Sequence, residues 1–165
     1  MNTMKSKHPR MFSGTRSYNK FDIAVGQLET AIRLFLQDGC DMFSAITLAG
    51  SAGEVLHGLV VKARRKPFVD EVVQMNASPT PSRSQVIKHI NATLFINEMK
   101  HYDDRNEEVI EFDAEECAMG AILKAIADYK TLTHTESAAM KAFIAWTYVN
   151  LDSDEVMKRY KETER

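Results

Sequence analysis

The residues best suited to chemistry lie together between positions 97 and 105. His101 carries an imidazole, which titrates near neutral pH and can transfer protons. Asn97 precedes it by four residues, so on a helix the two side chains would share one face. Lys100 and Arg105 add cations that could bind a phosphate backbone. We therefore predict a catalytic pair of Asn97 and His101, with Lys100 and Arg105 as nucleic-acid-binding residues.

A helix from Ser84 to about His101 would have to position this pair. Four apolar residues of that stretch fall within one sector of roughly 100°: Val86, Ile87, Ile90 and Leu94. Asn97 and His101 extend the same sector, so we expect this face to line a groove or a subunit interface. The alternative is that His101 only ends the helix and bonds to the carbonyls of its last turn.

Glu54 and His57 offer a second chemistry, because they have the Glu-x-x-His spacing of di-iron helical bundles. Such centres need two of these motifs and two further carboxylates. A single histidine beside a helix rich in small residues is more often structural. We predict no metal site and no cofactor, and a metal-dependent bundle enzyme is the least favoured function.

The elements around these residues are all expected to be helical. Apolar residues recur at helical spacing after Asn19, after Asp41, after Ser84, after Asp113 and after Thr133 or Thr135. The stretch 67–84 is the longest irregular segment, with a short helical or extended piece at 68–75. We predict an all-α bundle of about five helices in one domain over residues 19–150, between a basic tail (1–18) and a charged tail (151–165).

Composition narrows the class of protein. The chain has 165 residues, 44% hydrophobic and 27% charged, which is ordinary for one globular domain. Two cysteines cannot form a disulfide framework, and no run reaches the 18 apolar residues of a membrane span. We therefore expect a cytoplasmic protein without a membrane partner.

Charge is concentrated at the beginning of the chain. Residues 1–20 contain five basic residues and no acidic one, whereas the net charge of the whole chain is −2. The remaining 145 residues therefore carry −7 (−2 minus +5). We expect a solvated tail, and the alternative is an electrostatic arm for RNA or DNA.

The stretch "AIRLFLQDGCDMFSAITLAGSAGEVLHGLVVKA" at 31–63 resembles the first helical hairpin of HEPN-type domains. The turn would lie at 38–42, and Ala52-Gly53-Glu54 would be the step of two small residues and an acid. The resemblance implies an up-down helical arrangement and a homodimer. HEPN ribonucleases pair an Arg with a His four to six residues beyond it and cleave RNA without metal. Ile96 stands here where that Arg would be.

The segment "MKHYDDRNEEVIEFDAEE" and Asn97 before it are similar to an uncharacterised bacterial family that shares "N-x-x-KHADRDP…EFD", over residues 21–150. Together the two resemblances imply a HEPN-like interaction or binding module without an intact catalytic motif. Its expected partners are a second copy of the chain, RNA or an unidentified protein. The alternative is a metal-independent endoribonuclease of a toxin or phage-defence type that uses His101.

Overall fold

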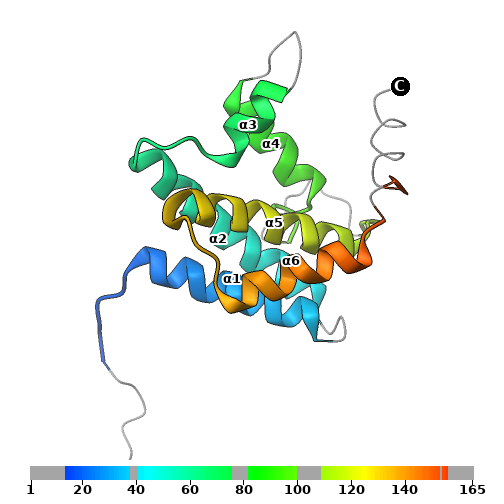
Figure 1. Ribbon diagram of the computed structural model, residues 1–165, viewed down its shortest axis with the longest axis horizontal. Helices are drawn as coiled ribbons and strands as arrows, with labels where there is room; N and C mark the ends of the chain where they lie inside the picture. Colours follow the sequence, from blue (N-terminus) through cyan, green and yellow to red (C-terminus); the bar gives the residue numbers. More distant parts are fainter. Residues whose placement is uncertain (1–13, 38–40, 76–81, 100–108, 153, 156–165) are drawn as a thin grey trace, which may run out of the picture.

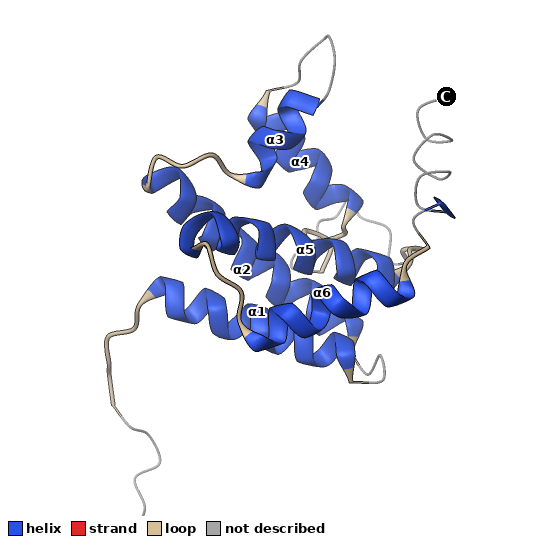
Figure 2. Ribbon diagram, in the orientation of Figure 1, coloured by secondary structure: helices blue, strands red, loops and turns tan. Residues whose placement is uncertain are grey.

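The computed structural model describes residues 14–37, 41–75, 82–99, 109–152 and 154–155. Within these ranges every regular element is a helix (Figures 1 and 2), which confirms the predicted all-α class. The helices are α1 (Lys20–Leu36), α2 (Met42–Lys62), α3 (Phe68–Met75), α4 (Arg83–Thr93), α5 (Ala114–Thr133) and α6 (Ala138–Asn150).

Polar side chains begin most of these helices. Asn19 accepts a hydrogen bond from the N–H of Phe21, and Asp113 accepts one from the N–H of Glu116, as expected of N-cap residues. The predicted start of the last helix at Thr133 or Thr135 is wrong. His134 adopts the left-handed conformation that ends α5, and Ser137 then caps α6.

Helix α2 is the centre of the bundle. It packs along α1 on one side and α5 on the other, and α6 covers α1 (Figure 1). Small residues let the neighbouring helices approach closely, since Ala45, Ala49 and Ala52 are fully buried. By length and composition α2 could also cross a membrane, with a mean hydropathy of 1.3. Core helices of soluble proteins meet the same criterion.

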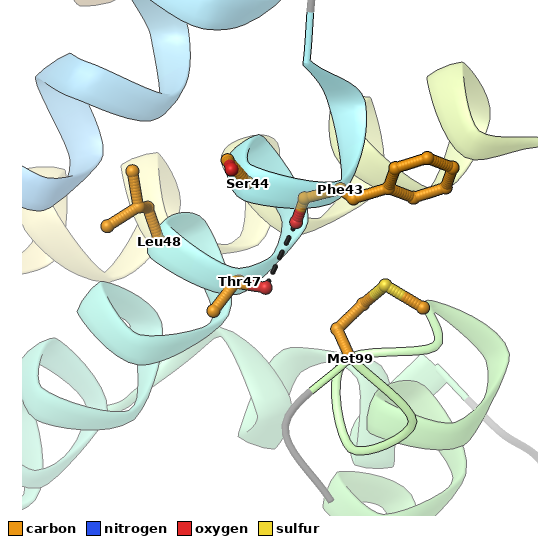
Figure 3. Close-up of a pocket in the computed structure, with 5 residues that line it drawn as sticks. All are labelled: Phe43, Ser44, Thr47, Leu48 and Met99. Carbon is orange, nitrogen blue, oxygen red and sulfur yellow. Dashed lines mark hydrogen bonds between the residues drawn. The ribbon is translucent and has the colours of Figure 1, made fainter.

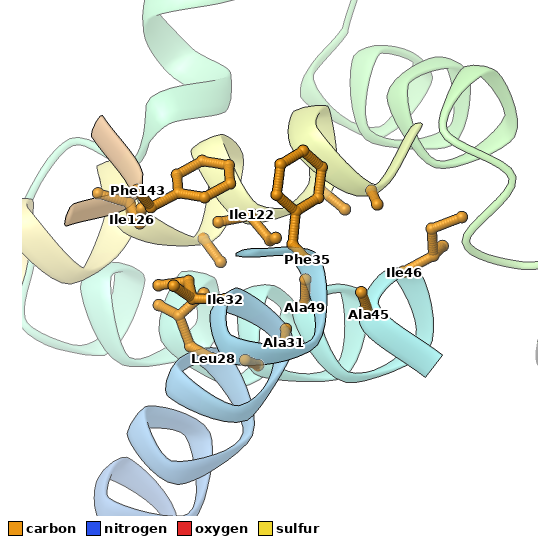
Figure 4. Packing of buried hydrophobic residues seen from close by; sticks show 14 of the residues in the cluster. Leu28, Ala31, Ile32, Phe35, Ala45, Ile46, Ala49, Ile122, Ile126 and Phe143 are labelled. Carbon is orange, nitrogen blue, oxygen red and sulfur yellow. The ribbon is translucent and has the colours of Figure 1, made fainter. Parts of the chain in front are cut away.

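The core is closed by aromatic contacts between α1 and α6 (Figure 4). The ring of Phe35 meets Phe143 edge-on at 5.1 Å and Trp146 at 4.8 Å. Ile32 and Ile122 fill the space beside them, and both are fully buried. This core fixes α1, α2, α5 and α6 relative to one another.

Helices α3 and α4 pack against each other outside this core, and α3 rests on α5 (Figure 1). The segment 68–75, which the sequence left open between helix and extended chain, is helical. Two bonds from the guanidinium of Arg83 to the carboxylate of Asp70, of 2.6 and 2.5 Å, tie α4 to α3. The predicted irregular stretch 67–84 is therefore helical over most of its described residues.

Candidate functional site

The four residues predicted to form the site are described only in part. Asn97 is exposed on the turn that follows α4. Lys100, His101 and Arg105 lie outside the described residues. The predicted cluster therefore stays a prediction, with one member placed at the surface.

The predicted helix from Ser84 to about His101 is wrong at its end, because α4 stops at Thr93. Phe95 takes a left-handed φ of 52°, and its N–H bonds to the carbonyl of Ala92. The N–H of Ile96 bonds to the carbonyl of Asn91, which completes a Schellman motif. Asn97 is therefore not on the helix that carries Val86, and no shared helical face aligns them.

Ile96, the residue that stands where HEPN ribonucleases carry an arginine, is a core residue with 1% of its surface exposed. It packs on Gly50 of α2 so closely that a Cβ added there would lie 2.5 Å from its Cγ2. Leu94, two residues earlier, packs in the same way on Gly120 of α5. A Cβ added at Gly120 would lie 2.6 Å from Cδ2 of Leu94. The turn after α4 thus packs on α2 and α5 through the apolar side chains of Ile96 and Leu94.

A small pocket of about 340 Å³ opens beside this turn, lined by Phe43, Ser44, Thr47, Leu48 and Met99. Met99 faces Phe43 and Thr47 across it (Figure 3). None of the five lining side chains is charged, and the hydroxyl of Thr47 donates to the carbonyl of Phe43 at 3.0 Å. Such a lining suits an apolar group and provides no acid or base for catalysis.

Aromatic side chains continue this apolar surface. The rings of Phe95 and Phe112 stack at 4.5 Å, and Phe43 lies 6.2 Å from Phe112 between ring centroids. Phe43 is 59% exposed despite these contacts. An apolar, partly exposed surface thus adjoins the pocket.

A second cluster, which the sequence analysis missed, lies between α2, α3 and α5. Asp128 of α5 is fully buried, and its Oδ1 accepts a 2.9 Å hydrogen bond from the N–H of Phe68 at the start of α3. Its Oδ2 is 3.9 Å from Nδ1 of His57, and neither of these two buried atoms has a hydrogen-bond partner. Lys124, one turn before Asp128, is only 6% exposed.

Burial dominates the protonation of this pair. It raises the pKa of Asp128, against the opposing effect of the hydrogen bond from Phe68. It lowers the pKa of His57, and the Asp128 carboxylate opposes that effect. Both shifts disfavour the charged form of the group concerned. A sequence signal existed, because Lys124 and Asp128 fall at buried spacing with Ala121 and Ala125 on α5.

The metal alternative gains no support from the described residues. Glu54 is exposed, whereas the Nδ1 of His57 is buried and faces Asp128. The Glu-x-x-His spacing recurs at Glu98 and His101, a repeat that the sequence analysis overlooked, but His101 is not described. Across the described ranges no three His, Cys, Asp or Glu side chains are grouped to hold a metal ion.

No protein-family model, curated protein or solved structure matches the chain.

Proposed function

We propose that the chain is a helical interaction module that works as a homodimer, with α6 as its self-association surface. The outward face of α6 is the observation that carries this proposal. Its inner face packs into the core through Met140, Phe143 and Thr147. The opposite face is apolar except for Lys141, although it is open to solvent.

The outward face of α6 is defined by six exposed residues, namely Ala138, Lys141, Ala142, Ala145, Tyr148 and Val149. Tyr148 is 83% exposed and Val149 is 82% exposed. Along α6 the one charged residue is Lys141. Helices that are apolar all round are normally covered on every side, so this face calls for a partner.

Spacing and charge favour a second copy of the chain as that partner. Ala138, Ala142, Ala145 and Val149 follow one another at intervals of four, three and four residues, as in the seam of a coiled coil. Small residues allow two such helices to pack closely about a twofold axis, with Tyr148 beside the seam. Lys141 is the one charge on this face, and it lies beside the seam with Tyr148, where its long side chain can keep the ammonium group in water.

The length of α6 indicates the strength of this dimer. A 13-residue helix is about 20 Å long, so one pair of helices buries less than the roughly 800 Å² per partner of a standard interface. We therefore expect a concentration-dependent dimer rather than a permanent one.

Substitution in the seam tests the proposal. Ala145→Glu places a charge at the centre of the face, and we expect it to raise the dimer dissociation constant at least about tenfold because each copy must then bury a carboxylate. Sedimentation equilibrium measures this constant. Ala92→Glu, at an exposed position of α4, is the matched control and should leave the constant unchanged. A wild-type chain that stays monomeric at high concentration contradicts the proposal.

The proposed module is not a nuclease, and the packing of Ile96 in the core supports this part of the proposal. An arginine at that position could not reach RNA without leaving Gly50. We therefore expect no cleavage when the wild type and a His101→Ala variant are incubated with mixed RNA in excess chelator. Cleavage by the wild type alone would instead establish the competing function, a metal-independent endoribonuclease with His101 as its acid–base group.

A further inference from the structure

The start of α3 covers Asp128 and lies over the side where Asp128 faces the buried Nδ1 of His57. Pro67 and Val69, at the beginning of this helix, are both fully buried, and Phe68 between them donates its N–H to Asp128. Asp128 has no exposed surface, while the side chain of His57 keeps 20% of its own. Moving α3 away from α5 would thus let water reach Asp128 and the buried Nδ1 of His57.

The charged groups around the pair come from three helices. Lys124 of α5 lies beside Asp128, and Gly53 of α2 leaves room for its ammonium group, since a Cβ there would be 3.3 Å from Nζ. Asp70 of α3 and Arg83 of α4 both act on His57, and they are bonded to each other. Their effects on His57 therefore oppose one another, and desolvation remains the largest.

Two physical effects of opposite sign act on the Asp128 carboxylate. Its charge strengthens the hydrogen bond from Phe68 and favours the N-terminus of α3, which would hold the helix down. Its charge also loses hydration when α3 closes, and only one of its oxygens gains a bond in return. The orphaned Oδ2, facing the equally orphaned Nδ1 of His57, indicates that the loss of hydration is the larger effect.

We infer that the His57–Asp128 pair sets how readily α3 opens, because charge on either member favours the open position. The pair is thus a proton-sensitive latch under α3, separate from the proposed dimer face on α6. It works through local opening of α3, while the core of α1, α2, α5 and α6 stays folded. Burial raises the pKa of Asp128 and lowers the pKa of His57, and both shifts have the signs that this coupling requires.

Hydrogen exchange of α3 tests the latch. Asp128→Asn keeps an oxygen for the N–H of Phe68 and removes the charge, so we expect amide exchange in Phe68–Met75 to slow several-fold at pH 7.5. Exchange in Lys20–Leu36 serves as the internal control for global stability. Faster exchange of α3 in Asp128→Asn would overturn the inference, because it would mean that the charged hydrogen bond holds the helix closed.

A pH series in the same variant isolates His57. Because burial by α3 lowers its pKa, closure is fully favoured above about pH 6.5 and is lost as pH falls from there through the lowered value. We expect exchange of α3, corrected for its intrinsic pH dependence, to rise below pH 6.5 in Asp128→Asn. The double variant with His57→Gln should remain flat over this range. Equal pH dependence in both would overturn the role of His57.

Discussion

At Arg64 the backbone has a φ of 55°, in the left-handed region that costs any residue with a Cβ. The residue occupies the position after the C-cap of α2, where the N–H of Arg64 bonds to Val61 and that of Arg65 to Val60. Glycine is the usual residue at this position of a Schellman motif. The strain at Arg64 is therefore local and removable.

We expect Arg64→Gly to raise the free energy of unfolding by about 1 kcal/mol, because glycine adopts this conformation without steric cost. Urea denaturation measures the change. Arg64→Ala is the control, since it removes the same exposed side chain but keeps the Cβ. An Arg64→Gly protein that is no more stable than Arg64→Ala would contradict this explanation.

Helix α2 contains glycines whose missing Cβ atoms face different surroundings. Gly50 receives Ile96, whereas Gly58 on the same helix has open space where its Cβ would be. These two glycines therefore differ in packing but not in secondary structure. Helix α2 itself supplies a matched pair of substitutions.

We expect Gly50→Ala to lower the free energy of unfolding by about 1 kcal/mol or more, because the new methyl group displaces a buried, β-branched side chain. Gly58→Ala should instead stabilise by up to about 1 kcal/mol through helix propensity alone. Thermal melts of the two variants should therefore shift in opposite directions. A shift of the same sign in both would show that Ile96 can move at little cost.

Helix boundaries show why sequence patterns succeed at some ends and fail at others. Asn19 and Asp113 predict the helices that follow them, because their side chains accept hydrogen bonds from backbone N–H groups of the first turn. The end of α4 has no such signal. Leu94 continues the apolar sector and Phe95 stands where glycine would be expected, so the stop is explained by the contacts that Leu94 and Ile96 make with Gly120 and Gly50.

Across the whole molecule, the all-α class follows from local periodicity, but the buried polar pair does not. His57 and Asp128 are 71 positions apart (128 minus 57), and they meet because α2 and α5 pack together. A single sequence does not specify which face of α2 meets α5. The prediction that Asn97 shares a helical face with Val86 rested on a continuous helix and is wrong because α4 ends at Thr93, whereas the pairing of Asn97 with His101 stays a prediction.

The two contacts made by the turn after α4 also constrain how this sequence can diverge. Each joins a bulky residue on the turn to a glycine on a central helix, Ile96 to Gly50 and Leu94 to Gly120. A larger residue at either glycine is accommodated only with a smaller one opposite. In homologous chains with this fold, positions 50 and 96 should therefore covary, as should positions 120 and 94.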